Sequence, residues 1–269
     1  MPDYHPVSRE RHANRHWQPS ADFGFAAQEA VVPLVAAELA RAAMAFAIAF
    51  VRQGEHFAPV AVLDFRPGSN LFVAPDGRWL ADYVPAAYRG HPFALANTAD
   101  GKQVLCVDES SPRLQETDGT PILGDDGQPS PDVRNVINFL TQVEQNRQLT
   151  QRVCGVLEKH DLIQPWPVRV QSDNGEEKIA GLFRVDEAAL NALAPAAFEE
   201  LRQAGALPVA YCQLLSMQNL QKLAALARQR TQALQQVAQS LTSVLPFSGE
   251  DLDLEFLNHG GVIRFGNFI

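Results

Sequence analysis

The chain has few cysteines and a shortage of positive charge, and both features narrow the class of protein. Its 269 residues include 3 cysteines, and 22 lysines and arginines stand against 31 aspartates and glutamates, which gives a formal net charge of −9. Nucleic acids and anionic membranes bind surfaces with concentrated positive charge, so we expect neither partner. The cysteines lie far apart within apolar runs, where buried free thiols are common, and this indicates a reducing compartment. They are Cys106, Cys154 and Cys212.

Signals for export and for membrane insertion are also lacking. Residues 1–19 carry arginines and histidines but no apolar stretch of a secretory signal, so we predict a cytoplasmic location and a flexible segment over residues 1–20. Residues 30–51 are mostly apolar, but they include Pro33, Glu38 and Arg41. An ionised side chain near the centre of a bilayer costs about 2.5 to 3.5 kcal/mol, so we predict no membrane span.

Motifs for metals and nucleotides are missing as well. The chain has no His-Glu-x-x-His, Cys-x-x-Cys or Walker sequence. His12 and His16 are four residues apart, but they could hold a metal only on an ordered helix, and Pro6 and Pro19 bracket a segment that we expect to be loose. The alternating acidic and apolar residues of 251–256 are typical of a half-exposed strand rather than a calcium loop. We therefore predict no metal and no cofactor.

The hydrophobic period changes halfway along the chain. Short apolar runs separated by turn residues predict strands over 44–51, 59–65, 70–73, 79–84, 91–97 and 103–107. After a polar loop over 110–131, helical spacing predicts a long helix that begins with Asp132 as N-cap. A hairpin around Asn174-Gly175, two short helices before Gly205, an extended run over 207–211 and a last helix complete the pattern. The fold class is α+β, with a largely antiparallel N-terminal sheet and helices concentrated in the second half. We expect a main domain over 21–230 and a C-terminal helix and tail over 231–269.

The last helix carries an apolar stripe at alternating steps of three and four residues. No charged residue occurs between Thr231 and Gly249, so the flanking charges of a free-standing coiled coil are missing. The helix could pack on its own domain, or residues 220–245 and the apolar tail could form a homodimer seam. Both alternatives stay open.

Several separate segments resemble the bacterial SapC-like family, in the same order along the chain. They are Asn70 to Phe93 (NLFVAPDGRWLADYVPAAYRGHPF), Val104 to Leu114 (VLCVDESSPRL), Gly181 to Leu193 (GLFRVDEAALNAL) and Ala210 to Met217 (AYCQLLSM). The resemblance covers about residues 33–228. It implies an association with bacterial surface layers and with genomic neighbours such as TonB-dependent receptors and flavin-dependent tryptophan-halogenase-like proteins. It supplies no catalytic residues, and a surface-layer role would require export.

The same block and its neighbour contain a candidate ligand-binding set. An arginine offers a bidentate fork to a carboxylate, and aromatic rings offer a stacking wall, so the set suits a small acid or a peptide end. The alternative is a structural arginine and histidine held by loop carbonyls. The residues are Trp79, Tyr83, Arg89, His91 and Arg113.

Acid–base chemistry has only weak candidates. Asp108-Glu109 ends a strand, where a carboxylate can serve as an acid or base, although an aspartate there more often caps the turn and would pair with Arg113. Asp108 and His91 are therefore the weak catalytic candidates. The leading interpretation is a cytoplasmic accessory protein that binds a peptide or small acid and partners a flavin-dependent halogenase-like enzyme. An enzyme acting on a peptide or amino-acid-like substrate is the alternative, and a surface-layer protein is a third reading from the family name alone.

Overall fold

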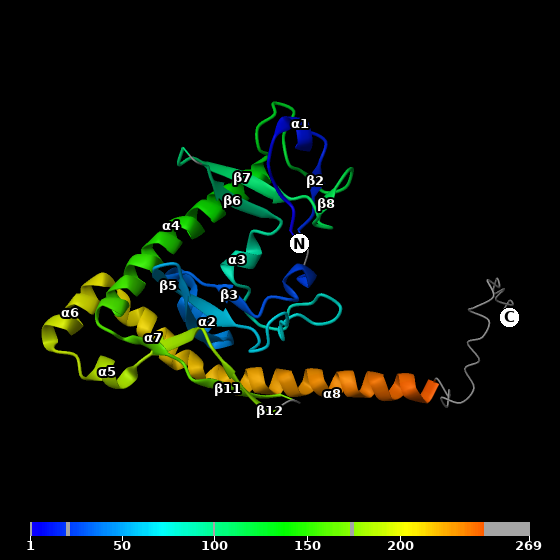
Figure 1. The fold of residues 1–269 in the computed structure, drawn as a ribbon. Coiled ribbons are helices and arrows are strands. Elements are labelled where there is room, and N and C mark those ends of the chain that lie inside the picture. Colours follow the sequence, from blue (N-terminus) through cyan, green and yellow to red (C-terminus); the bar gives the residue numbers. More distant parts are fainter. Residues whose placement is uncertain (1, 20–21, 99, 173–174, 245–269) are drawn as a thin grey trace, which may run out of the picture. The chain divides into compact units, whose positions relative to one another are not determined.

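The structure is a computed structural model that describes residues 2–19, 22–98, 100–172 and 175–244 (Figure 1). The chain divides into two units, residues 1–227 and residues 228–269. In the described residues the first unit contains four sheets and two separate hydrophobic cores, and the second contains the end of the last helix. The α+β prediction is confirmed.

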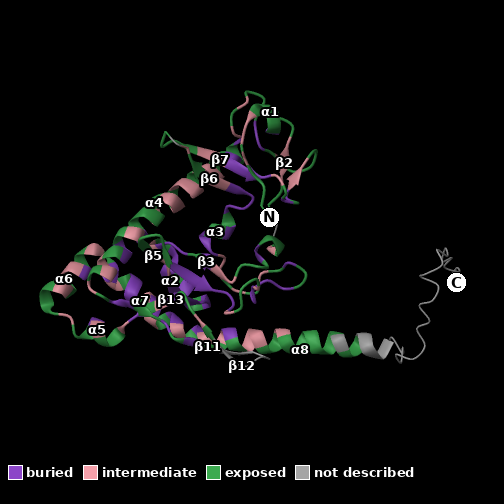
Figure 2. Ribbon diagram, in the orientation of Figure 1, coloured by how far each residue is buried: buried purple, intermediate pink, exposed green. Residues whose placement is uncertain are grey.

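The larger sheet has five antiparallel strands in the order β10-β13-β4-β5-β3. Strands β4 and β5 form a hairpin in which Gly54 takes a positive φ of 60°, a conformation that favours glycine. Buried residues concentrate on these strands (Figure 2), as expected for continuous apolar runs. The strands are β3 (Val31–Pro33), β4 (Ala47–Gln53), β5 (His56–Val62), β10 (Ile163–Pro165) and β13 (Leu182–Val185).

Helices α2 (Leu39–Ala45) and α7 (Ala206–Ser216) pack against each other, and α7 also contacts β4. The extended run predicted over 207–211 is wrong, because the buried positions of this segment recur at steps of three and four and place one helical face on the sheet. Gln213 fixes the contact: its Nε2 donates to the carbonyl of Ile48 at 3.1 Å, and its Oε1 accepts the Val185 N–H at 2.9 Å.

The smaller core involves the N-terminal segment, so the expectation of a flexible segment over residues 1–20 is corrected. Strand β1 pairs with β7, and β2 pairs with both β8 and β9, which lie in the loop after β7. Trp17 of β2 packs edge-on against Phe93, with ring centroids 5.3 Å apart. These strands give the segment its backbone partners. The elements are β1 (Tyr4–Pro6), α1 (Arg9–His12), β2 (His16–Trp17), β6 (Phe93–Asn97), β7 (Gln103–Asp108), β8 (Leu114–Gln115) and β9 (Thr120–Pro121).

Strand β6 pairs with β7 in the three-stranded sheet β1-β7-β6. Helix α4 (Pro131–Lys159) contacts β6 of this sheet and β5 of the large sheet, and it contributes residues to both cores (Figure 1). Its N-cap lies two residues before the predicted one, Asp132. Ser130 is the N-cap, its Oγ accepts the Val133 N–H at 3.4 Å, and Pro131 occupies the first turn, where its missing N–H is not needed.

Replacing Ser130 by alanine is expected to lower the free energy of unfolding by about 1 kcal/mol, because the Val133 N–H loses its capping acceptor. Urea denaturation measures the change. Ser240→Ala on the exposed face of α8 is the control, with an expected change below about 0.5 kcal/mol. Equal effects of the two substitutions would contradict the assignment of the cap.

The strand predicted over 70–73 is wrong, because this segment is a turn that contributes a single bridge, from Val73 to Trp79. Three later predictions, a hairpin and two short helices, are confirmed with small shifts. Strands β11 (Val168–Ser172) and β12 (Gly175–Ile179) form the expected hairpin, whose turn residues 173 and 174 lie outside the described part. Asp186 caps α5 (Glu187–Asn191), and α6 (Pro195–Ala204) ends at Gly205 in the left-handed conformation. The shortest helical elements are α3 (Ala86–Arg89), η1 (Gly24–Ala26), η2 (Ala36–Glu38) and η3 (Met217–Asn219).

The last helix, α8 (Leu220–Val244), is confirmed. In the second unit its stripe residues Leu234 and Val237 are 63% and 58% exposed, and the predicted homodimer seam stays a prediction. The apolar segment over 262–269 lies outside the described residues. None of the described helices is both long and apolar enough to cross a membrane.

Candidate functional site

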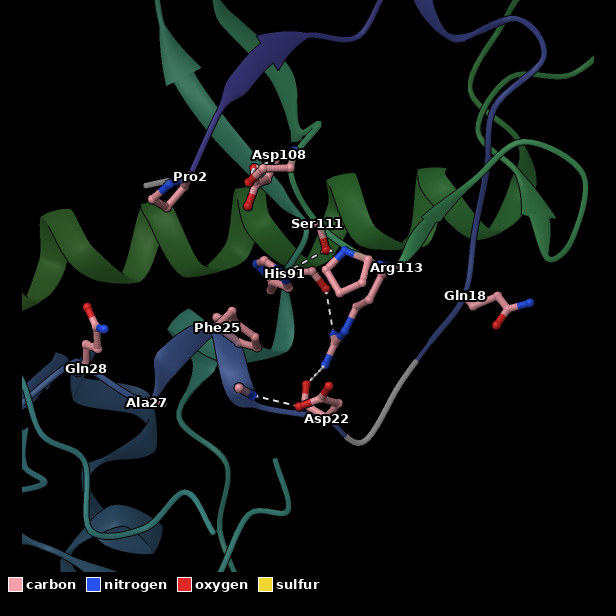
Figure 3. Close-up of a pocket in the computed structure, with 13 residues that line it drawn as sticks. Pro2, Gln18, Asp22, Phe25, Ala27, Gln28, His91, Asp108, Ser111 and Arg113 are labelled. Carbon is pink, nitrogen blue, oxygen red and sulfur yellow. Dashed lines mark hydrogen bonds between the residues drawn. The ribbon is translucent and has the colours of Figure 1, made fainter. Parts of the chain in front are cut away.

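The site lies where α3 leads into β6, between the two cores of the first unit. His91 follows α3 and is buried, and its ring stacks on Phe25 at a centroid distance of 3.8 Å and an interplanar angle of 7° (Figure 3). Its Nε2 forms a 3.1 Å hydrogen bond with the Ser111 hydroxyl. Residues from the N-terminal segment, the α3–β6 junction and the loop after β7 therefore meet at one imidazole.

Arg113 is a buried cation whose partners are backbone carbonyls. Its Nη1 donates to the carbonyl of His91 at 3.0 Å, and its Nη2 donates to the carbonyl of Asp22. The guanidinium carbon lies 5.4 Å from the centre of the Phe25 ring. Among the described residues Arg113 forms no ion pair with Asp108, so the predicted pairing of the two is wrong. Burial lowers the pKa of Arg113, and the nearby charge of Asp22 opposes this shift. Two of the five N–H donors of Arg113 are engaged by the two carbonyls, as the alternative structural interpretation expected.

Asp108 takes the turn-capping role at the end of β7. Its Oδ1 accepts the Ser110 hydroxyl at 2.6 Å and the backbone N–H groups of Ser110 and Asp3 at 3.1 and 2.8 Å. Burial opposes ionisation, but these hydrogen bonds outweigh it and hold the pKa of Asp108 below its usual value. Within the described part of the chain no group donates to Oδ2. Asp108 therefore presents an ionised carboxylate with one oxygen available to a ligand.

Burial is the main reason that His91 is neutral near pH 7. Burial and the nearby Arg113 charge lower its pKa from 6.5 to about 4, against an opposing contribution from Asp108. We expect the imidazole to remain uncharged across the physiological range. A histidine with this pKa is a hydrogen-bonding group rather than a pH switch.

The lowered pKa of His91 predicts how the free energy of unfolding changes with pH. Between about pH 6.5 and 4 the unfolded chain binds a proton at His91 that the folded chain does not, so the stabilisation is complete above pH 6.5 and falls as the pH drops toward 4. We expect His91→Gln to remove about 1 kcal/mol of the difference in unfolding free energy between pH 7 and pH 5, after allowance for partial contact of the ring with solvent. Urea denaturation at the two pH values measures it. A His91 resonance that titrates near pH 6.5 by NMR would contradict the account.

These groups line a cavity of about 490 Å³, here called the Arg113 pocket. Figure 3 shows His91, Ser111 and Arg113 on one side of it, with Asp22 and Phe25 below. The pocket brings together the N–H donors of a guanidinium, a neutral imidazole and an ionised carboxylate, which accepts hydrogen bonds. Such a set can bind a ligand that carries both hydrogen-bond acceptors and donors. Its principal lining residues are Asp22, Phe25, His91, Asp108, Ser111 and Arg113.

The other three predicted ligand-binding residues lie outside the lining of this pocket. Trp79 donates through Nε1 to the carbonyl of Tyr83 at 2.7 Å, and its ring packs against the core ring of Phe72 with centroids 5.9 Å apart. Arg89 donates to the Tyr83 hydroxyl at 3.3 Å and lies over the Phe139 ring of α4 at 4.9 Å. The strand predicted over 79–84 is a loop with a single bridge, from Val73 to Trp79. Trp79, Tyr83 and Arg89 therefore hold the segment before His91 in place.

Glu38 is the residue that the sequence did not reveal. It is buried, its Oε1 accepts the Val35 N–H at 3.0 Å, and its Oε2 accepts the Tyr83 hydroxyl at 2.7 Å and the Ala86 N–H at 2.8 Å. In the sequence this carboxylate stood out only as an obstacle to a membrane span. The neighbouring sequence does not indicate this role, because the Tyr83 hydroxyl and the Ala86 N–H that bind the carboxylate lie 45 and 48 residues further along the chain.

The pocket residues Phe25, Ser111 and Asp22 were also missed. Ser111 could have been found from its place two residues before Arg113 in the segment Asp108-Glu109-Ser110-Ser111-Pro112-Arg113. Phe25 and Asp22 come from a segment whose contact with His91 and Arg113 is made only by the fold.

Each histidine of the pair considered for metal binding contacts other groups. His12 is buried on α1, where its Nδ1 accepts the Ser8 N–H at 3.2 Å, and His16 Nδ1 lies 3.2 Å from the carbonyl oxygen of Glu116. Among the residues that the structure describes, no group of three or more histidine, cysteine or acidic side chains could hold a metal ion.

Comparison with known protein families identifies the family of this chain. A family model described as SapC matches residues 7–223. The chain belongs to the SapC family. The match confirms the resemblance expected over 33–228 and begins earlier, so the N-terminal elements α1 and β2 belong to the SapC region, as does all of the Arg113 pocket except Pro2. No curated protein and no solved structure matches this SapC chain.

Proposed function

We propose that this SapC protein is a cytoplasmic accessory protein whose Arg113 pocket binds a peptide segment or a small acidic ligand. The observation that supports the proposal is a buried guanidinium with three N–H donors that no described group accepts, in a pocket wide enough for a ligand. Burying a cation is costly, the nearby charge of Asp22 offsets this cost in part, and a ligand carboxylate would accept the remaining donors. The Asp108 oxygen and the Ser111 hydroxyl would bind the ligand's polar groups.

Binding is favoured over catalysis by the state of His91. One observation supports the enzyme alternative, because Ser111 and His91 are hydrogen-bonded as a nucleophile and its base would be. However, a general base works best with a pKa near the operating pH, and that of His91 is about 4. Asp108, the other weak catalytic candidate, has one oxygen saturated by hydrogen bonds.

Fewer observations support the proposals about partners. A flavin-dependent halogenase-like enzyme as partner follows from the family resemblance, and the surface-layer reading follows from the family name. A homodimer through residues 220–245 and the tail is proposed from the exposed stripe residues Leu234 and Val237. Sedimentation of the full chain and of a Leu234→Lys/Val237→Lys variant tests the dimer, and a wild-type monomer would overturn it.

The binding proposal is tested with a pooled tetrapeptide library that has free carboxyl ends, retained by the full-length protein and read by mass spectrometry. We expect retained peptides to bind at least tenfold more weakly to Arg113→Gln and to Ser111→Ala, because both variants remove donors from the pocket. Arg202→Gln is the control, since Arg202 is exposed on α6 and pairs with Glu199. Failure of any peptide to bind the wild type, or equal binding to all variants, would overturn the proposal.

A further inference from the structure

A second hollow adjoins the Arg113 pocket. Its volume is about 370 Å³, and four residues line both cavities: Pro2, Phe25, His91 and Asp108. The stacked rings of Phe25 and His91 therefore form a wall that the two cavities share. A ligand that enters one cavity can extend past this wall into the other.

The second hollow has mostly apolar walls with two unusually exposed rings. Tyr4 of β1 is 44% exposed and Phe25 of η1 is 36% exposed, although both are large hydrophobic side chains. Tyr88 and Phe93 add two buried rings, and Leu140 of α4 closes another side. Aromatic side chains that line a hollow while partly open to solvent are typical of a site that covers a flat or branched apolar group. We call this cavity the Tyr4–Phe25 hollow.

The charges of the Tyr4–Phe25 hollow are acidic. Glu29 and Glu144 line it together with the shared Asp108, and no lysine or arginine among the described residues does. Glu29 accepts the Tyr88 hydroxyl at 2.8 Å, and Glu144 is paired with Arg147 at 2.7 Å. A second carboxylate of a ligand would meet like charge here, so a dicarboxylic acid does not suit the combined site.

We infer that the combined site takes the carboxyl end of a peptide, with the terminal carboxylate in the Arg113 pocket and an aromatic or branched side chain in the Tyr4–Phe25 hollow. This inference rests on the proposed function and narrows it from peptides and small acids in general to one class. The peptide N–H groups find acceptors in Asp108 and in Ser111. The Phe25–His91 pair lies between the two ends of the ligand.

Three probes test the ligand class by calorimetry on the full-length protein: acetyl-Gly-Gly-Phe, acetyl-Gly-Gly-Ala and acetyl-Gly-Gly-Asp. Burial of a phenylalanine side chain contributes about 1.5 to 3 kcal/mol, so we expect the phenylalanine probe to bind about 10- to 100-fold more tightly than the alanine probe. The aspartate probe is expected to bind no more tightly than the alanine probe. The same peptide with a C-terminal amide in place of the carboxylate should bind at least tenfold more weakly.

Two exposed tyrosines supply a matched pair of variants. Tyr4→Ser removes one wall of the hollow and should reduce the preference for phenylalanine over alanine at least threefold, whereas Tyr211→Ser, at a similar exposure on α7, should leave it unchanged. As a second variant, Ala94→Phe fills the hollow and should weaken only the phenylalanine probe, with Ala96→Phe on the same strand as its control.

The outcomes separate this inference from the function on which it rests. Equal binding of the phenylalanine and alanine probes, both lost in Arg113→Gln, would overturn the inference and leave the proposed function standing. A phenylalanine preference that survives both Tyr4→Ser and Ala94→Phe would also overturn it. No binding of any probe or of the tetrapeptide pool would overturn both.

Discussion

Replacing Glu38 by alanine is expected to lower the free energy of unfolding by about 3 to 4 kcal/mol, because three buried or half-buried donors lose their acceptor. The donors are the backbone N–H groups of Val35 and Ala86 and the Tyr83 hydroxyl. The carboxylate also forms a long ion pair with Arg89, whose Nη2 lies 4.0 Å from Oε2. Hydrogen bonds to an ionised acceptor are stronger than neutral ones, which places this substitution at the upper end of the usual range.

The measurement is urea denaturation of Glu38→Ala with Glu55→Ala as control, because Glu55 is exposed in the β4–β5 turn. The control should change the unfolding free energy by less than about 0.5 kcal/mol. A double-mutant cycle with Tyr83→Phe is expected to show coupling of about 1 kcal/mol. A loss below 1 kcal/mol in Glu38→Ala would mean that the segment from Trp79 to Arg89 is held by packing alone, and the role assigned to Glu38 would be wrong.

Replacing Gln213 by leucine is expected to cost about 2 to 4 kcal/mol, although leucine is similar in size and more apolar. The amide is fully buried and joins three elements, since it donates to Ile48 of β4 and accepts from Val185 of β13. Leucine would leave one backbone N–H and one carbonyl without a partner, at about 1 to 3 kcal/mol for each group, offset in part by the apolar gain.

Gln218→Leu, five residues further along the chain at an exposed position, is the matched control and should be near neutral. Urea denaturation compares the two variants. If Gln213→Leu proves as stable as the control, the amide does not fix α7 on the sheet.

The sequence predicted the elements whose signals are local. The β4–β5 and β6–β7 hairpins, the caps at Asp186 and Gly205 and the helical stripe of α8 follow from turn chemistry and periodicity, and the structure has all of them. The predictions were wrong where contacts between residues distant in the sequence determine the local structure. Residues 4–17 are ordered by strands that lie about 100 residues away in the chain, and residues 207–211 are helical because Gln213 and Ser216 bond the sheet.

The candidate site shows the same division. His91, Asp108 and Arg113 were predicted together, because one strand pair and its following loop keep them close. Trp79, Tyr83 and Arg89 carry the same residue types, but Glu38 and α4 engage them in structural contacts. The residue types alone predicted that all of these side chains form a recognition surface. Which of them line the pocket depends on their burial and on the groups that they contact.

The central claim is that the Arg113 pocket is a binding site, and NMR titration of the full-length protein with acetyl-Gly-Gly-Phe tests it most directly. We expect a saturable shift of the Arg113 Nε–H resonance together with the backbone amide resonances of residues 22–28, 108–111 and 113. Arg202, which is exposed on α6 and pairs with Glu199, should not respond. Shifts confined to other regions, or an Arg113 resonance that does not move at saturation, would contradict the claim.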